Sequence, residues 1–304
     1  MKEPTPHLLE CDHAGSQPGM HRMAYWSHGL PHHAHVVVCV HGLARQGRDF
    51  DVLAQRLVGE DGRRCRVVAV DVVGRGLSDW LPDPSLYQVP QYAADLLMLL
   101  MALKGQGAQT VDWVGTSMGG LIGIAVAAQT VLTPSLDMFA PRKLVLNDIG
   151  PVVQWAALQR IKDYIGADSR FASEQEAMDA MWKVSTSFGP HTPEQWRALC
   201  LPMIRKDGNQ FKLHYDPAIA VPVRATTPET AAQAEAILWQ LYDQIKADTL
   251  LIRGKESDLI SEATAKQMQE RGPKVKLVEF AGVGHAPMLV QTDQVDAVEA
   301  FLFP

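Results

Sequence analysis

The residues with the clearest potential for chemistry lie in the segment VGTSMGG, residues 114–120. It contains the pattern Gly-x-Ser-x-Gly, directly after an apolar run expected to be a strand (110–114) and directly before an Ala- and Gly-rich stretch expected to be a helix (119–130). A tight turn of this kind exposes the serine hydroxyl, and the glycines at 115 and 119 let neighbouring backbone approach. The helix N-terminus also favours developing negative charge. We therefore predict that Ser117 is a nucleophile.

Short β-branched runs recur along the chain with helical segments between them, which is typical of an α/β fold. The runs are nearly continuous, as strands buried on both faces of a parallel sheet require. We expect such strands at 36–40, 66–70, 110–114, 143–147, 249–253 and 275–280, and helices at 91–104 and 119–130. Aromatic residues within 20–28 indicate an earlier antiparallel edge strand or two. The sequence thus predicts a mostly parallel sheet with helices on both faces.

The strand pattern is interrupted between residue 150 and about residue 228. Helical spacing is present at 155–165, 173–184 and 193–201, and no segment of this part indicates a strand. A helix at 229–246 would lead back to the sheet, whose pattern resumes at Thr249. We expect a core formed by residues 1–149 and 229–304, with an inserted helical cap at 150–228.

With this turn on such a sheet, the chain resembles the α/β-hydrolase fold family over nearly its whole length. In that family a serine, an acid and a histidine follow one another along the chain, and the histidine lies in a loop after the last strand. His285 matches that position, in the segment AGVGHAP (281–287) between the expected strand 275–280 and an expected terminal helix, 292–303. The resemblance implies that His285 takes the Ser117 proton during attack and returns it to the leaving group.

Two aspartates compete for the position of the acid. Asp258 follows the strand 249–253 in a segment that resembles the usual acid loop of the family. Asp148 ends the preceding core strand, a position from which some relatives supply their acid, or it anchors the cap hinge or bonds active-site backbone. We favour Asp258, because a carboxylate there can accept the imidazole N–H and hold the tautomer that activates Ser117. Glu256 is a further option, expected to be solvated.

The resemblance also implies an oxyanion hole. The His-Gly segment 41–42 follows the first core strand as it does in the family, so the backbone N–H groups of Leu43 and Met118 are expected to face the developing negative charge. Removing one such donor costs roughly 3 to 4 kcal/mol of transition-state stabilisation. Arg45 lies two residues beyond Leu43 and could attract a substrate carboxylate, although a solvent-facing or ion-paired arginine is the preferred interpretation.

Several other features have a structural interpretation that competes with a functional one. The histidines at 28, 32, 33 and 35 lack an ordered frame of ligands, so we predict no metal site. Asp71 and Arg75, in a glycine-rich loop, are expected to shape the fold. Aromatic and methionine side chains of the cap either line an acyl pocket or form the core of the cap itself. These are Trp155, Trp182, Phe188, Trp196, Met178, Met181 and Met203, of which Trp155 and Trp182 are our candidates for substrate contact.

The composition argues against several classes of function. The 304 residues include 28 Lys and Arg against 34 Asp and Glu, a formal net charge of -6, whereas a nucleic-acid binder would be basic. No apolar run approaches the roughly 20 residues of a membrane span. The N-terminal segment lacks the basic start and apolar run of a signal peptide, so we expect a cytoplasmic protein. The four cysteines form no Cys-x-x-Cys pair and are expected to be free thiols.

These features together predict a serine hydrolase that cleaves a carboxylic ester or related acyl bond of a small molecule through an acyl-enzyme on Ser117, without a cofactor. Hydrolysis of carbon–carbon bonds or enol-lactones in aromatic degradation remains an alternative, as does acyl transfer to an alcohol or thiol. A fold does not fix a function, so a non-catalytic ligand-binding receptor is the alternative from another class. The oligomeric state stays open.

Overall fold

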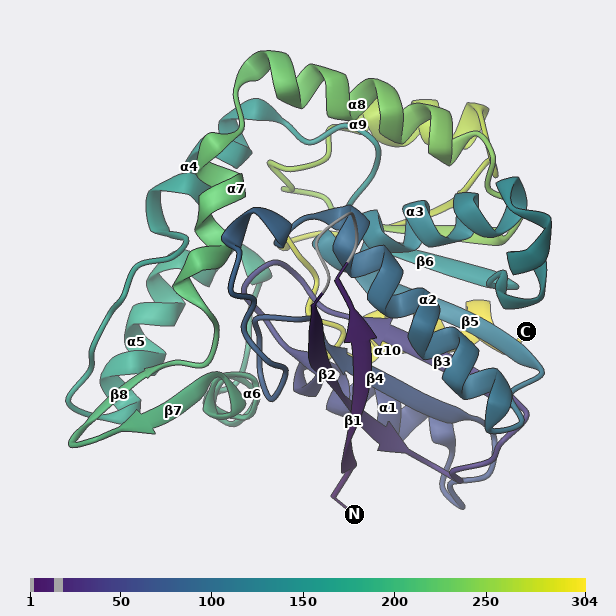
Figure 1. Cartoon of the computed structure of the whole chain (residues 1–304). Coiled ribbons are helices and arrows are strands. Elements are labelled where there is room, and N and C mark those ends of the chain that lie inside the picture. Colours follow the sequence, from purple (N-terminus) through teal and green to yellow (C-terminus); the bar gives the residue numbers. More distant parts are fainter. Residues whose placement is uncertain (1–2, 14–18) are drawn as a thin grey trace.

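The computed structural model describes residues 3–13 and 19–304, and its centre is a sheet with the strand order β1-β2-β4-β3-β5-β6-β9-β10 (Figure 1). Every predicted core strand is present. The strands are β1 (Thr5–Asp12), β2 (Met20–His28), β3 (His35–Val40), β4 (Arg66–Asp71), β5 (Thr110–Thr116), β6 (Lys143–Asn147), β9 (Asp248–Gly254) and β10 (Lys276–Phe280).

The direction of the strands also agrees with the sequence analysis. From β4 to β10 in the sheet order, every pair of adjacent strands is parallel. The β1–β2 pair is antiparallel and joins the sheet through an antiparallel pairing of β2 with β4. The expected antiparallel edge is therefore confirmed. Because β3, β5, β6, β9 and β10 are parallel, their carboxyl ends meet at one edge, where loops can bring distant side chains together.

Helices cover both faces of the sheet, as predicted. In β3, Val36 and Val38 belong to one hydrophobic core and Val37 to the other, because successive side chains of a strand alternate between the faces. Helices α2, α3, α8 and α9 pack with the first core, and α1 and α10 with the second. Their bounds are α1 (Asp51–Val58), α2 (Val89–Gly105), α3 (Met118–Leu132), α8 (Pro228–Tyr242), α9 (Glu262–Glu270) and α10 (Thr292–Leu302).

Between β6 and α8 the chain leaves the sheet and forms the insertion, residues 150–227, which Figure 1 shows to one side of the core. The three predicted helices are present. The prediction that this segment contains no strand is wrong, because a short antiparallel hairpin follows α6. Its two-residue turn contains Gly208 at φ 61°, a Gly-Asn hairpin signal in a polar stretch too short to show strand periodicity. The elements are α4 (Trp155–Tyr164), α5 (Glu174–Ser185), α6 (Pro193–Cys200), β7 (Ile204–Asp207), β8 (Gln210–Leu213) and α7 (Ala220–Ala225).

The sequence also makes predictions about membrane-spanning helices and about the state of the cysteines. Among the described residues, no helix has both the length and the apolar character needed to cross a membrane. The cysteines are free thiols, as predicted, and all of them are buried.

Candidate active site

Ser117 occupies a sharp turn between β5 and α3. Its backbone has φ 52° and ψ -119°, a region that residues with side chains rarely adopt. Hydrogen bonds fix the turn: the Ser117 N–H donates to the Asn147 carbonyl at 3.0 Å, and the Gly120 N–H donates to the Ser117 carbonyl at 2.8 Å. The turn therefore holds the hydroxyl at the carboxyl end of β5 and at the N-terminus of α3.

Two glycines allow the backbone to pack this closely. A Cβ atom added to Gly119 would lie 2.0 Å from the carbonyl oxygen of Val40, and one added to Gly115 would lie 2.3 Å from the carbonyl oxygen of Gly119. Both neighbours are backbone atoms, which cannot rotate away as a side chain would. The glycines of the Gly-x-Ser-x-Gly pattern are thus required by packing, since neither has a positive φ.

We expect Gly119→Ala to lower the free energy of unfolding by about 3 kcal/mol, because the new methyl group would push β3 and α3 apart. Denaturant unfolding measures this change. Gly105→Ala, at the end of α2, is a matched control, since an added Cβ there meets no atom within 4 Å. Alanine should be neutral at that position or stabilise the helix by up to about 1 kcal/mol. Equal stability of the two variants would contradict the close approach at the turn.

His285 lies within hydrogen-bonding distance of Ser117, with 2.9 Å between its Nε2 and the Ser117 Oγ. Its loop follows β10 and is held by a residue of the insertion. The hydroxyl of Ser187 donates to the His285 carbonyl at 2.7 Å, and the Gly284 N–H donates to the Ser187 carbonyl at 2.7 Å. The structure thus brings together the predicted serine and histidine, which are 168 residues apart in the sequence.

The other ring nitrogen of His285 contacts Asp148, with 2.7 Å between Nδ1 and Oδ2. Asp148 directly follows β6, has φ 54° and is fully buried. Its carboxylate also accepts hydrogen bonds from the Gly254 N–H at 2.9 Å and from the Ser257 hydroxyl at 2.7 Å. Burial of a carboxylate without hydrogen-bond donors would cost free energy, and these donors offset that cost. They also orient the carboxylate toward the imidazole.

The prediction that Asp258 is the acid partner of His285 is wrong. Its side chain is 46% exposed and accepts two hydrogen bonds from the guanidinium of Arg160, at 2.8 and 3.0 Å. The loop after β9 turns so that the neighbouring Ser257, rather than Asp258, reaches Asp148. Glu256 is exposed, as expected, and its carboxylate also accepts a hydrogen bond from the Val283 N–H at 2.9 Å, which helps to hold the histidine loop.

Ser187 and Ser257 also position the site, although the sequence did not predict them. Neither belongs to a recognisable motif. Ser257 is the neighbour of Asp258, and in a search of this segment for an acid Asp258 is the residue that stands out. Ser187 lies in the insertion and contacts the histidine loop only through the fold, so no local pattern could reveal it.

The two N–H groups predicted for the oxyanion hole are available. Met118 is the first residue of α3, whose N–H has no acceptor within its own helix. Within residues 3–13 and 19–304, neither this N–H nor that of Leu43 donates a hydrogen bond. The Leu43 loop lies against the turn, since a Cβ added to Gly42 would be 3.6 Å from the Ser117 Cβ. Their role as an oxyanion hole stays a prediction.

Two buried side chains hold the Leu43 loop in place. Burial lowers the pKa of His41 to about 3, so its ring is neutral, and its Nε2 accepts a hydrogen bond from the Val72 N–H at 2.9 Å. Arg75 is also fully buried and donates from Nε to the Leu43 carbonyl at 2.8 Å. Its predicted structural role is therefore confirmed.

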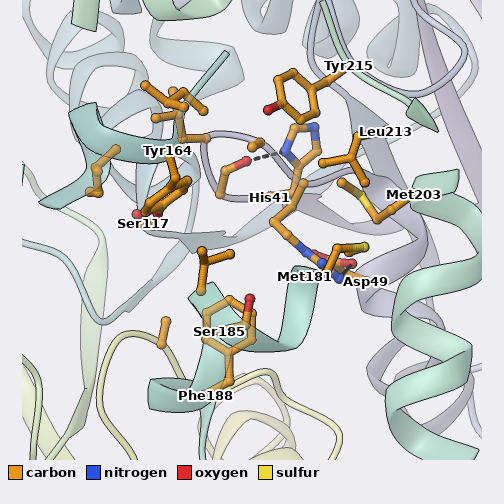
Figure 2. A pocket seen from close by; sticks show the side chains of 18 of the residues that line it. His41, Asp49, Ser117, Tyr164, Met181, Ser185, Phe188, Met203, Leu213 and Tyr215 are labelled. Atoms are coloured by element: carbon orange, nitrogen blue, oxygen red, sulfur yellow. Dashed lines mark hydrogen bonds and ion pairs between the residues drawn. The ribbon is translucent and has the colours of Figure 1, made fainter. Parts of the chain in front are cut away.

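A cavity of about 230 Å³ lies beside Ser117 and His285, and more than half of its lining residues belong to the insertion (Figure 2). Its wall is mostly apolar. Figure 2 shows Met181, Met203 and Leu213 together on one side of the cavity, with Phe188 on another. These residues come from α5, from the turns that follow α5 and α6, and from β8. Part of the aromatic and methionine set of the insertion thus lines a pocket.

The two tryptophans proposed for substrate contact do not line this cavity. The ring of Trp155 is covered by the Lys162 ammonium group at 4.8 Å, and Trp182 packs edge-on against Trp196 at 5.0 Å. Because α5 turns by about 100° per residue, Met181 faces the cavity while Trp182 faces outward, 37% exposed. The prediction for Trp155 and Trp182 is wrong.

Arg45 does line the cavity, but its charge is already satisfied. Its guanidinium donates to both carboxylate oxygens of Asp49, at 2.7 and 2.5 Å, and to the Leu199 carbonyl at 2.9 Å. This is one of the two states, solvent-facing or ion-paired, predicted for Arg45 from the sequence.

The four histidines between 28 and 35 do not converge. His28 lies near Asp51, and His35 is paired with Asp112 at 2.7 Å. A different group, Cys11, His21 and Asp95, is the one set in the described ranges with ligand atoms close enough to share a metal ion. His21 Nε2 bonds Asp95 at 3.0 Å, and burial raises the pKa of the Cys11 thiol to about 12, which disfavours the thiolate that would bind a metal ion. We therefore interpret this group as buried packing around a hydrogen bond.

The chain is similar to known hydrolases over most of its length. The model of the alpha/beta hydrolase family matches residues 37–300. A 3-hydroxybutyrate-oligomer hydrolase from Cupriavidus necator is 44% identical over 94% of each chain. A pimeloyl-[acyl-carrier protein] methyl ester esterase from Xanthomonas axonopodis is 25% identical and covers 89% of this chain and 96% of its own.

Solved structures of hydrolases are also similar to this chain. An alpha/beta hydrolase from Novosphingobium aromaticivorans is 30% identical over 99% of both chains, with a TM-score of 0.80. A putative hydrolase from Rickettsia typhi is 25% identical over 98% of both chains, with a TM-score of 0.84. The family match covers most of the chain, and the resemblance seen in the sequence is confirmed. The chain belongs to the alpha/beta hydrolase family.

Proposed function

We propose that the protein is a serine hydrolase of carboxylic esters, with Ser117, His285 and Asp148 as its catalytic triad. The observation that carries this proposal is a continuous hydrogen-bonded chain. It runs from the Asp148 carboxylate to His285 Nδ1 at 2.7 Å and from His285 Nε2 to the Ser117 hydroxyl at 2.9 Å. In this arrangement the carboxylate holds the tautomer in which Nε2 can accept a proton.

The reaction then follows from these positions. His285 takes the Ser117 proton as the hydroxyl oxygen attacks the ester carbonyl, and the resulting oxyanion faces the N–H groups of Leu43 and Met118. His285 returns the proton to the alcohol oxygen as the carbon–oxygen bond breaks, which leaves an acyl group on Ser117. A water molecule, deprotonated by the same imidazole, attacks the acyl carbonyl. The bond to Ser117 breaks, the acid is released, and His285 returns the proton to the Ser117 oxygen.

For the substrate class, we propose small linear esters of 3-hydroxybutyrate. The support is the relative named as a 3-hydroxybutyrate-oligomer hydrolase, which is 44% identical over nearly the whole chain. The apolar cavity wall suits the methyl and methylene groups of such an ester, and a volume of about 230 Å³ suits a short molecule.

We further propose that residues 150–228 act as a cap on a core formed by 1–149 and 229–304. Support comes from the cavity, whose apolar wall includes Met181 and Leu213 of the insertion while Ser117 and His285 belong to the core. The reacting atoms thus come from the core, and the insertion supplies a large share of the binding surface. Substrate preference would follow from the insertion, and chemistry from the core.

The experiment that tests this function is the incubation of the purified protein with the dimer of 3-hydroxybutyrate, followed by chromatography of the products. We expect release of the monomer with turnover. Thermal stabilisation by the dimer without hydrolysis of it or of p-nitrophenyl butyrate would contradict the proposal and favour a ligand-binding receptor. Addition of an alcohol or thiol that captures the acyl group in preference to water would indicate a transferase.

The cavity wall gives a prediction with a neighbouring control. Met181→Ala should raise KM for p-nitrophenyl butyrate by about tenfold, because it removes apolar contact from the pocket. Trp182→Ala, one residue away and facing outward, should leave KM within a factor of about two. Steady-state kinetics, with thermal unfolding of both variants, make the comparison. A larger effect at Trp182 would contradict the assignment of the pocket.

A further inference from the structure

Among the described residues that line the cavity, two are arginines, Arg45 and Arg160. They differ in how their charges are compensated. Arg45 and its partner Asp49 are both nearly buried, with side chains 12% and 8% exposed. Removing one member of such a pair leaves an uncompensated buried charge, which is strongly unfavourable. Arg45 is therefore a fixed part of the wall and has no capacity for another anion.

Arg160, on α4, has an exchangeable partner. Its guanidinium donates two hydrogen bonds to Asp258, and the side chains of the pair are 40% and 46% exposed. An exposed ion pair of this kind contributes only about 1 kcal/mol or less to stability. In this pair the guanidinium binds a carboxylate by donating two parallel hydrogen bonds, the arrangement that arginine favours. Another carboxylate could replace Asp258 at little cost.

A second polar group stands beside this arginine. Tyr164 is four residues further along α4, on the same face of the helix, and it also lines the cavity. Burial raises the pKa of the Tyr164 hydroxyl, and the Arg160 charge opposes this rise, as expected for neighbouring groups. Among its described lining residues, the mostly apolar cavity therefore contains one replaceable arginine with a hydroxyl nearby.

We propose that Arg160 binds the free carboxylate of an ester substrate in exchange for Asp258, so that the enzyme prefers hydroxyacid esters with an ionised end. This inference rests on the proposed ester hydrolysis and adds the group that selects the substrate. In a dimer of 3-hydroxybutyrate the carboxylate belongs to the alcohol side of the ester, a few bonds from the scissile carbonyl. Arg160 would thus hold the leaving group, and Asp258 would occupy the guanidinium until the substrate arrives.

The test compares two substrates that differ only in charge: the 3-hydroxybutyrate dimer and the same dimer with a terminal carboxamide. Arg160→Gln should raise KM for the acid by about 10- to 100-fold and leave KM for the carboxamide within about twofold, because only the acid loses a charged hydrogen bond. Asp258→Asn removes the competitor and should leave KM for the acid the same or lower it. Arg22→Gln is a matched control, since Arg22 pairs with Asp79 on the surface at 2.8 Å and does not line the cavity.

Two results would overturn the inference. If Arg160→Gln raises KM equally for the acid and the carboxamide, the arginine does not recognise charge. If Asp258→Asn raises KM for the acid as much as Arg160→Gln does, the pair only joins the insertion to the core. Failure of the proposed function is distinguishable, because the wild type would then cleave neither dimer. Cleavage of both dimers with equal KM would contradict the carboxylate site alone.

Discussion

Ser117→Ala is expected to lower kcat for p-nitrophenyl butyrate by at least about 10⁴-fold, because no acyl-enzyme can form without the hydroxyl. The variant should fold normally, because the backbone hydrogen bonds that hold the turn remain. The hydrogen bond to His285 is the one that the variant loses. Circular dichroism and thermal unfolding check the fold, and steady-state kinetics measure the loss.

A second serine of the cavity provides the control for this variant. Ser185 also lines the cavity, on α5, but lies outside the hydrogen-bonded chain of the triad. Ser185→Ala should therefore retain kcat within a few-fold. Comparable activity in the Ser117 and Ser185 variants would mean that the hydrolysis does not pass through Ser117.

Asp148→Asn is expected to lower kcat by about 10⁴-fold, the size of effect seen when an amide replaces the acid of a serine triad. Asparagine keeps the shape of the side chain and tolerates the positive φ of 54°, but its NH₂ group would face His285 and stabilise the wrong tautomer. Asp258→Asn should change kcat on the same neutral ester by no more than a few-fold. Kinetics of both variants, with folding checked by unfolding, rank the two aspartates. The reverse ranking would contradict the assignment of Asp148.

The parts of the fold that the sequence predicts well are those whose pattern is local and strong. Each core strand is a nearly continuous apolar run, and burial on both faces of the sheet requires that pattern. The Gly-x-Ser-x-Gly turn is similarly local, because its glycines and serine are neighbours in the chain and their constraint is the backbone of the turn itself. The helices α1 and α9 have only 8 and 9 residues, which leaves little periodicity to detect.

The choice of the acid depends on geometry that the sequence does not show. Asp148 and Asp258 follow β6 and β9, which are neighbours in the sheet, so both lie near the same edge. Only the loop conformations decide between them: Asp148 turns inward at φ 54°, while the next loop contributes Gly254 and Ser257 as donors to it. Asp258 then remains outside, opposite Arg160. The predictions for Trp155 and Trp182 fail for the same reason, because helical spacing does not reveal which face borders a cavity.

The most direct test of the central claim, that Ser117 is an activated nucleophile, is intact-mass spectrometry after treatment with a small fluorophosphonate, run beside Ser117→Ala. This reagent reports an activated serine without requiring knowledge of the substrate. We predict one adduct on the wild type and none on the variant. An unmodified wild type that is folded, or equal modification of wild type and variant, would contradict the proposal that Asp148, His285 and Ser117 work as a triad.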